Sequence, residues 1–402
     1  MTRGGSVGQP MDEHREHGDG PQDQGGFLAR LAHAPGFRKH FPKWLRRFGR
    51  FFVPHEAYMR QLWRLNDPYA DAEEVSTCPA RVDVRLGILT EITHSHKNYI
   101  GACRDLGVPY RLLDISAPDW VRVIRESDCA GFLVHPPSHL TIWKQMFDER
   151  LKVMVGDLGK TIYPSYNELW LYESKRRMAY WLEANDVPHP RTRVFYDLEE
   201  ALESCRTVDL PIVVKSDLGS GASGVRIFRD RSPLRRFVAR CFRTGIVRRD
   251  GDPRDRQWGS VLLQEYVPDA REWRVIRLGD SFFAHQKLKM GDFHSGSGLV
   301  EWCDPPRRLL DFARETTDKG GFTSMNLDTF ETPDGRYFVS ELQSVFGSYL
   351  PYQMRVNDTP GRYLYDASRR EWVFERGEFN KNGSCNLRVE TLLRMLGKRL
   401  SP

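Results

Sequence analysis

The chain has 402 residues, 40% hydrophobic and 28% charged, which is enough for two or three domains with buried cores. Its net charge of +6 is only mildly basic, so it gives no reason to expect nucleic acid and equally suits an enzyme with anionic ligands. The seven cysteines contain no C-x-x-C pair, which argues against a disulfide framework or a zinc ribbon. We find no secretory signal and no apolar run of the ~18 residues that span a bilayer, and we therefore expect a cytoplasmic protein.

The first part of the chain contains two contrasting stretches. Residues 1–26 are rich in Gly, Gln, Asp and His and are predicted to be a disordered tail. Residues 27–79 form a basic and aromatic extension, in which 38–52 (RKHFPKWLRRFGRFF) have the spacing of an amphipathic helix. Such a helix packs on its own protein, or contacts a partner or the inner face of a membrane peripherally. Pro42 and Gly49 interrupt it and favour packing on its own protein.

From residue 80 to about 170, short apolar stretches alternate with amphipathic ones. This alternation is typical of a parallel sheet with helices on its faces, so we expect an α/β domain. After Ile212 the strands come close together with turns between them, which predicts an antiparallel α+β arrangement, and 366–402 are expected to be helical. The predicted strands are 84–90, 109–115 and 129–137, and the predicted helices are 96–107, 117–127, 141–159 and one within 172–190.

Residues 212–228, IVVKSDLGSGASGVRIF, contain a glycine loop of the form G-x-G-x-x-G. A Rossmann loop precedes a helix, a Walker A loop has its lysine after the glycines, and a protein-kinase loop comes with H-R-D and D-F-G motifs. Here Lys215 precedes the glycines, a strand follows them, and both kinase motifs are missing. Backbone N–H groups of such a loop can approach phosphate oxygens, with Lys215 as a point charge. The alternative is a glycine-rich hairpin with a surface lysine.

Residues 326–344, NLDTFETPDGRYFVSELQS, are predicted to be two strands joined by a Thr-Pro-Asp-Gly turn. In the register that this turn predicts, Asp328 lies opposite Val339. Asp328 and Glu341 are then diagonal neighbours on one face, together with Gln343. Two carboxylates and an amide oxygen suit Mg²⁺, although the outer face of a solvated hairpin would look similar. In this register the same face also carries Phe330, Tyr337 and Val339, which fits a partly covered cleft better than open solvent.

Between the loop and the hairpin, residues 261–267 (VLLQEYV) are predicted to be a strand. The end of this strand offers Glu265 and the backbone of Tyr266 and Val267 as an edge for adenine. Glu272 lies seven residues beyond Glu265 and is a candidate to accept ribose hydroxyls. A solvated strand end is the alternative explanation for both glutamates.

The order of these features resembles the ATP-grasp superfamily, and within it the carboxylate–amine ligases such as glutathione synthetase, D-alanine–D-alanine ligase and the ribosomal-protein glutamate ligases. The features are a helix lysine, a strand lysine, a glycine loop, Q-E-Y-V, an acidic residue and D…E-x-Q on a hairpin, within about 81–360. The resemblance implies a pre-ATP-grasp α/β domain at 80–170 and an ATP-grasp domain at 171–365. A lid subdomain would span about 190–268, with ATP held between two α+β subdomains.

The resemblance also implies roles for the matching residues. Lys175 and Lys215 would bind phosphates of ATP beneath a flexible glycine lid, and Mg²⁺, or Mn²⁺, would bind to two carboxylates. Among the charged residues near these motifs, we single out Arg274 to hold the transferring phosphoryl group or an oxyanion. Lys287 and His294 are weaker candidates for the same role, because each could equally be an ordinary surface residue. The implied nucleotide-binding residues are Lys175, Lys215, Gly219, Ser220, Gly221, Ser223, Gly224, Gln264, Glu265, Tyr266, Val267 and Glu272, and the implied metal ligands are Asp328, Glu341 and Gln343.

Three departures from the family pattern fall on the substrate side. Gln343 stands where Asn is usual, His294 replaces an arginine, and QSVFGSY follows the metal glutamate without the usual Pro-Gly. The implied activity is a ligase that joins a small-molecule, peptide or glycan carboxylate to an amine through an acyl phosphate. The alternatives are a phosphotransferase acting on a hydroxyl and a non-catalytic ATP-binding regulatory protein. For the oligomeric state, a homodimer is one of the arrangements that the sequence allows.

Two histidines follow the first strand of the α/β domain. His94 and His96 lie in ITHSHKN, at the end of a strand where substrate clefts form in parallel sheets. They could line such a cleft or bind a metal. We favour an exposed polar loop.

Overall fold

The computed structural model describes residues 67–77, 79–219, 224–248, 251–289, 299–346 and 350–401, which belong to one compact unit. The expected disordered tail and nearly all of the basic extension lie outside the described residues. So do Ser220, Gly221, Ser223 and the loop that contains His294. Among the residues described, none of the helices is both long and apolar enough to cross a membrane.

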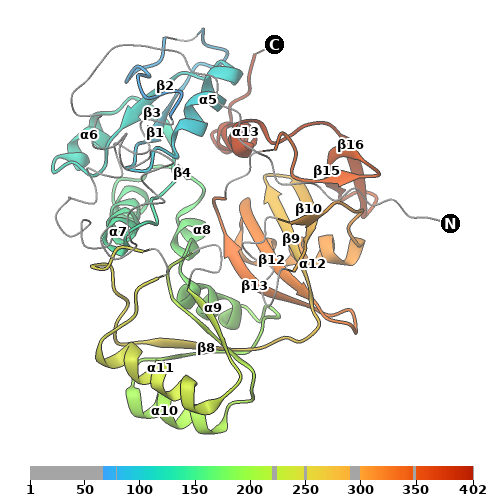
Figure 1. Cartoon of the computed structure of the whole chain (residues 1–402). Coiled ribbons are helices and arrows are strands. Elements are labelled where there is room, and N and C mark those ends of the chain that lie inside the picture. The colour runs from blue at the N-terminus through green and yellow to red at the C-terminus, as the bar shows by residue number, and fades with distance from the viewer. Residues whose placement is uncertain are drawn as a thin grey trace, which may run out of the picture. The chain divides into compact units, whose positions relative to one another are not determined.

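The N-terminal part is a four-stranded parallel sheet in the order β2-β1-β3-β4, which confirms the predicted α/β arrangement (Figure 1). The strands are nearly continuous apolar runs because helices cover the sheet. α5 ends at Gly107, whose φ of 64° is a left-handed conformation that glycine adopts without strain. The elements are β1 (Arg85–Leu89), α5 (Lys97–Leu106), β2 (Tyr110–Leu113), α6 (Trp120–Glu126), β3 (Cys129–Leu133), α7 (Thr141–Gly156) and β4 (Ile162–Tyr163).

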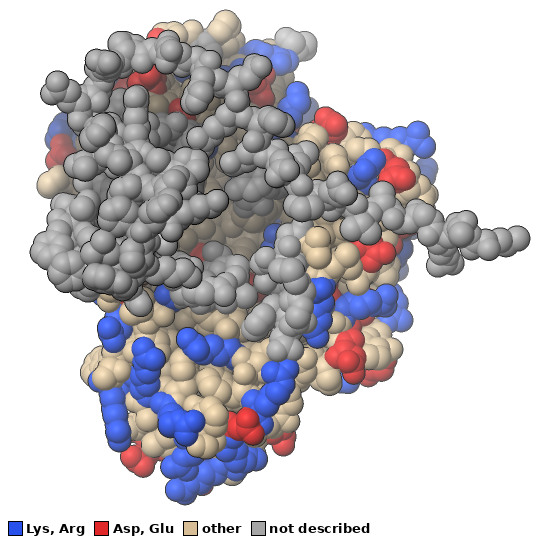
Figure 2. Space-filling view, in the orientation of Figure 1, with Lys and Arg blue, Asp and Glu red and all other residues tan. Residues whose placement is uncertain are grey.

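A second, antiparallel sheet has the order β5-β8-β6-β7, and its buried face packs on α10 and α11. Strands β6, β7 and β8 were predicted from the sequence, whereas the two helices were not. Figure 2 shows Lys and Arg side chains gathered over the region of α10 and α11, where α11 is rich in arginine. The elements are α8 (Tyr166–Leu171), α9 (Lys175–Ala184), β5 (Thr192–Phe195), α10 (Leu198–Thr207), β6 (Ile212–Lys215), β7 (Val225–Phe228), α11 (Arg231–Arg243) and β8 (Val261–Glu265).

The third sheet is antiparallel and has eight strands, of which β13-β12-β9-β10 are neighbours (Figure 1). Its apolar face forms the largest core cluster, with side chains of α9 and α12. The segment 366–402, expected to be helical, contains a strand before its helix. The elements are β9 (Arg271–Leu278), β10 (Ser281–Lys287), β11 (Val300–Glu301), α12 (Arg307–Gly320), β12 (Ser324–Glu331), β13 (Tyr337–Gln343), β14 (Arg355–Val356), β15 (Thr359–Asp366), β16 (Glu371–Arg376), the 3₁₀ turn Lys381–Ser384 and α13 (Cys385–Met395).

The register of the β12–β13 hairpin differs from the predicted one. Asp328 lies directly opposite Glu341, whereas Val339 lies opposite Thr329. The register shifts between these two pairs because Ser340 is an additional residue on β13, as in a β-bulge. Val339 is therefore fully buried in the core and does not share the face of the carboxylates. The bulge brings the two carboxylates closer together than the sequence-based register did.

Candidate functional site

Four adjacent strands present a charged, largely buried face. Paired positions on neighbouring antiparallel strands share a face, and so do alternate positions along one strand. Asp328 pairs with Glu341 on one side and with Arg274 on the other, and Arg274 pairs in turn with a position on β10. The face consists of Glu341 and Gln343 from β13, Asn326 and Asp328 from β12, Glu272 and Arg274 from β9, and His285 and Lys287 from β10.

Asp328 is the centre of this face. Its carboxylate accepts hydrogen bonds from Arg274 Nε at 3.0 Å and from Lys287 Nζ at 2.6 Å. Lys287 also contacts Glu272, with 2.5 Å between Nζ and Oε1. Burial alone would raise the pKa of Asp328, but the two cations outweigh it and hold that pKa well below its usual range. The structure thus brings the proposed metal carboxylate and two of the three predicted catalytic residues into one ion cluster.

The two predicted phosphate lysines reach the neighbouring carboxylate from different elements. Lys175, at the start of α9, lies 3.0 Å from Glu341 Oε1 and also donates to the carbonyl of Gly219. Lys215, at the end of β6, donates to the Ser340 carbonyl at 3.4 Å. Burial lowers the pKa of Lys215, whereas for Lys175 the effect of burial is outweighed by Glu341, which raises its pKa. Two lysine charges therefore converge beside the bulged hairpin.

The base of the glycine loop is fixed to α9 by a residue that the sequence analysis missed. Asp217 accepts hydrogen bonds from Ser174 Oγ at 2.8 Å and from the backbone of Arg176 at 3.0 Å. The signal for Asp217 in the sequence was an acidic residue two positions after the loop lysine.

Gly219 has a φ of 135°, which favours glycine, and a Cβ on Gly224 would lie 1.7 Å from the Ser216 hydroxyl. Both ends of the loop therefore require glycine.

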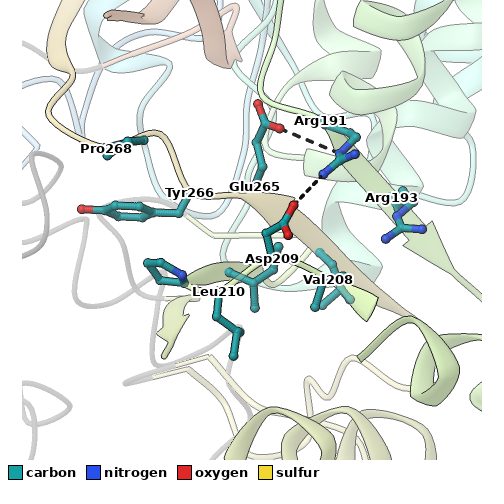
Figure 3. Close-up of a pocket in the computed structure, with 11 residues that line it drawn as sticks. Arg191, Arg193, Val208, Asp209, Leu210, Glu265, Tyr266 and Pro268 are labelled. Atoms are coloured by element: carbon teal, nitrogen blue, oxygen red, sulfur yellow. Dashed lines mark ion pairs between the residues drawn. The ribbon is translucent and has the colours of Figure 1, made fainter. Parts of the chain in front are cut away.

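The predicted adenine edge at the end of β8 has two faces. Gln264 pairs with Val213 and shares the face of Lys215, and its side chain donates to Thr192 Oγ1 at 2.9 Å. Glu265 points to the opposite face, where it contacts Arg191 at 3.8 Å and lines a surface cavity of about 320 Å³ (Figure 3). Tyr266 lines that cavity too. The side chain of Glu265 is therefore not on the lysine face, and only its backbone remains available to a nucleotide there.

The histidines after β1 are not in an exposed loop, contrary to our expectation. His96 is 5% exposed, and its Nδ1 accepts the backbone N–H of Glu91 at 3.2 Å. His94 has a φ of 52° and its Nδ1 lies 2.9 Å from Asp67 Oδ2. His135, which the sequence analysis did not single out, follows β3 at the same edge of the sheet, and burial lowers its pKa to about 4. These side chains line the carboxyl end of the parallel sheet.

The donor set on β12 and β13 fits a magnesium ion. Asp328 and Glu341 face each other directly, and Mg²⁺ prefers such oxygen ligands together with waters and phosphates. Asn326 Nδ2 donates to Asp328 Oδ1 at 3.2 Å, while the buried Asn326 Oδ1 has no partner. The predicted third ligand, Gln343, instead uses its Oε1 to accept the N–H of Glu173 at 3.3 Å. The free amide oxygen beside the carboxylates thus belongs to Asn326, whose position two residues before Asp328 was the signal in the sequence.

The comparisons with known proteins give distant similarity. No family model matches the sequence. The carbamoyl phosphate synthase large chain of Clostridium botulinum (strain Alaska E43 / Type E3) is 21% identical over 214 residues, which are 50% of this chain and 19% of that protein. The α-aminoadipate–LysW ligase LysX of Sulfurisphaera tokodaii is 26% identical over 179 residues, 43% of this chain and 59% of that protein. The chain thus spans about a fifth of the first relative and less than two thirds of the second.

Among solved structures, the RimK domain protein ATP-grasp of Sphaerobacter thermophilus has 18% sequence identity and a TM-score of 0.46, covering 64% of this chain and 90% of that one. The ADP complex of PurK, N5-carboxyaminoimidazole ribonucleotide synthetase, has 12% identity and a TM-score of 0.48, covering 68% of this chain and 73% of that one.

Proposed function

We propose that this chain has an ATP-grasp fold and is an ATP- and Mg²⁺-dependent ligase that joins a carboxylate to an amine. The observation that carries the proposal is the convergence of Lys175, Lys215, Asp328 and Glu341 from α9, β6 and the β12–β13 hairpin. Clustered lysines beside paired carboxylates suit a triphosphate with its metal ion. The substrates and the cytoplasmic location are parts of the same proposal.

Each lysine would exchange its present contact for a phosphate oxygen. Lys175 would keep its pairing with Glu341 and release the Gly219 carbonyl, and Lys215 would release the Ser340 carbonyl; both carbonyls are uncharged acceptors. A hydrogen bond between two charged groups is stronger than one to a neutral carbonyl. Asp328, Glu341 and Asn326 would hold Mg²⁺ or Mn²⁺. The bound ion would supply positive charge that screens the phosphates.

Arg274 is better placed than Lys287 to touch a reacting group. Its side chain is 27% exposed while it pairs with Asp328, whereas the Lys287 side chain is 9% exposed and lies between two carboxylates. In the proposed reaction a substrate carboxylate attacks the γ-phosphorus of ATP, and an amine then displaces phosphate from the acyl phosphate. Arg274 would stabilise the negative charge that develops in either step. We assign Lys287 to holding Asp328 and Glu272 in place.

The role of Asn326 can be tested by metal affinity. Asn326→Ala removes the free oxygen and is expected to weaken the binding of Mn²⁺ with ATP by at least about tenfold, since even indirect partners of a metal are worth that much. Electron paramagnetic resonance of free Mn²⁺ in titrations measures the affinity without turnover. Thr329→Val is the matched control, because Thr329 Oγ1 is also buried without a partner but Thr329 lies on the other face of β12. An unchanged affinity in Asn326→Ala excludes the ligand role.

The reaction class can be tested by product analysis. We expect ADP to form when the protein is given Mg·ATP, a carboxylate and an amine, and mass spectrometry to find an amide. Asp328→Ala should release no ADP above background. A phosphorylated hydroxyl compound would show a phosphotransferase instead. Failure to bind ATP in a calorimetric titration, with or without Mg²⁺, would remove the basis of the proposal.

A further inference from the structure

Arg388, on α13, is a buried cation whose hydrogen bonds are incomplete. It is 2% exposed and is the largest of the fully buried side chains among the described residues. Its Nε donates to Ser324 Oγ at 3.1 Å, and its Nη1 donates to the Gly383 carbonyl at 3.0 Å. Its Nη2 is buried and has no partner. Two of the three nitrogens thus fix the guanidinium, and the third is left for another group.

No carboxylate of the described residues forms an ion pair with Arg388 within 4.0 Å. Glu168 is the acid at the same end of β12, and its carboxylate is bound to backbone N–H groups instead. Glu168 Oε1 accepts the N–H groups of Thr323 and Ser324, and Oε2 accepts the N–H of Ser165. A buried charge without a counter-ion is strongly unfavourable, and natural proteins pair such charges. The guanidinium lies over the Phe346 ring, 4.8 Å from its centroid, and an anion would supply both the counter-charge and the hydrogen bond that Nη2 lacks.

Arg388 stands at one end of the strip of polar side chains that leads to the proposed metal site. Ser324, Asn326 and Asp328 alternate along β12 and so point to the same face. Four residues of strand place Ser324 about 13 Å from Asp328. Ser324 Oγ also donates to the Ser344 carbonyl at 2.7 Å, so this hydroxyl joins Arg388 to the end of β13. The guanidinium thus lies at a fixed distance from the reacting end.

The carboxyl end of the parallel sheet faces the same region. His135 follows β3 and is half-buried, and its ring makes an edge contact with Tyr172 at 6.3 Å between centroids. Tyr172 lies three residues before Lys175. Tyr163, the last residue of β4, donates its hydroxyl to the Thr323 carbonyl at 2.8 Å, so this edge of the sheet lies next to Ser324, the partner of Arg388. Ligands of open parallel sheets bind at this edge. A ligand at this edge would be close to Arg388.

We propose that Arg388 binds a second anionic group of the substrate, a carboxylate or a phosphate separate from the carboxylate that reacts. The proposal rests on the proposed function, since it gives the substrate class of the same site. The substrate is then a diacid, held by Arg388 at one end and presented to the phosphates at the other. The guanidinium suits this role because its planar N–H groups match the geometry of carboxylates and phosphates.

The test compares matched acids as substrates and ligands. Succinate, glutarate and adipate are each compared with the monoamide of the same length, and 4-phosphonobutyrate tests a phosphonate in the distal position. Carboxylate-dependent ADP release and the thermal shift with Mg·ATP are measured. At one chain length or more, the wild type should bind the diacid, or the phosphonate, at least tenfold more tightly than the monoamide. Equal responses to diacids and monoamides at every length overturn the proposal.

Two variants separate anion binding from a purely structural role. Arg388→Gln should raise the KM for the diacid at least tenfold, leave ATP affinity unchanged and remove the preference over the monoamide, while Arg388→Lys should restore part of it. Arg394→Gln is the control, since Arg394 lies on the same helix but is exposed and pairs with Asp280 at 2.7 Å. Retention of the preference in Arg388→Gln overturns the proposal. If that variant does not fold, the wild-type comparison decides alone.

The failure of this inference is distinguishable from that of the proposed function. If monocarboxylates promote ADP release as well as diacids do, only the anion site is wrong. If no carboxylate promotes ADP release and ATP does not bind, the ligase assignment itself is wrong.

Discussion

Asp328→Asn is expected to abolish ATP turnover and to destabilise the protein. The substitution keeps the shape of the side chain but removes the charge that pairs with Arg274 and Lys287 and that would bind the metal ion. Leaving buried charges without their partner costs about 3–5 kcal/mol in comparable pairs. We therefore expect ADP release to fall to background and the free energy of unfolding in urea to fall by an amount of this order.

The matched control is Asp334→Asn in the turn of the same hairpin. Asp334 also pairs with an arginine, Arg336, at 2.7 Å, but its side chain is 57% exposed. Exposed pairs contribute little, so this variant should keep both its activity and its stability. Wild-type ADP release by Asp328→Asn would exclude Asp328 from the catalytic site. A loss of stability without a loss of activity would reduce its role to a structural one.

The sign of the pH effect follows from the same cluster. The pKa of Asp328 is held below the value of 3.8 that is usual for such a carboxyl, so its contribution to stability is complete above that value. The contribution is lost as the pH falls from there through the lower pKa of the folded state. The wild type and Asp328→Asn should therefore differ most in unfolding free energy near neutral pH, and the difference should shrink in acid.

Lys215→Met is expected to lower turnover by at least about a hundredfold, the size of effect seen when one preorganised donor to a developing charge is removed. It should also weaken ATP binding. The lysine is held among buried groups that include Glu341 and Asp328, and burial lowers its pKa in the absence of a ligand. Methionine fills a similar volume without a charge, so the fold should persist. Steady-state ADP release and calorimetric ATP titration measure the two effects.

Lys319→Met is the control for Lys215→Met. Lys319 also donates to a backbone carbonyl, that of Asn185 at 2.7 Å, but it is exposed. The Lys319→Met variant should leave ATP affinity unchanged.

Phosphate groups favour the charged form of Lys215 and therefore raise its pKa, so ATP binding should take up a proton at alkaline pH. This uptake, measured in buffers of different ionisation enthalpy, should disappear in Lys215→Met; its persistence would assign it to another group.

The features that the sequence predicted well are local in character. Lys215, the glycines after it and the strand that follows form one continuous segment, and their order alone excluded the Rossmann and Walker A loops. The alternation of strands and helices before residue 170 is set by which side chains are apolar, and it predicted the parallel sheet. Helices α10 and α11 were not predicted, although their strongly charged segments carry an apolar stripe that packs on the second sheet.

The register of the hairpin depended on interactions between strands. The predicted turn placed Asp328 opposite Val339, whereas the additional residue Ser340 places it opposite Glu341. Burying Val339 in the core and pairing Asp328 with Arg274 of β9 both favour the bulged register. β9 lies some fifty residues earlier in the chain, so a pattern within the hairpin carries no information about this pairing.

The sequence by itself determined the residue types available to the site, namely two lysines, Lys175 and Lys215, glycines that permit close approach, and acids on one hairpin. Periodicity and motif order carry that information because they depend on neighbours in the chain. Only the tertiary structure decided which of them meet: Asp217 with the start of α9, Asn326 with Asp328, and Arg388 with Ser324. Such contacts join distant segments, and they arise because buried polar groups must find partners wherever the folded chain supplies them.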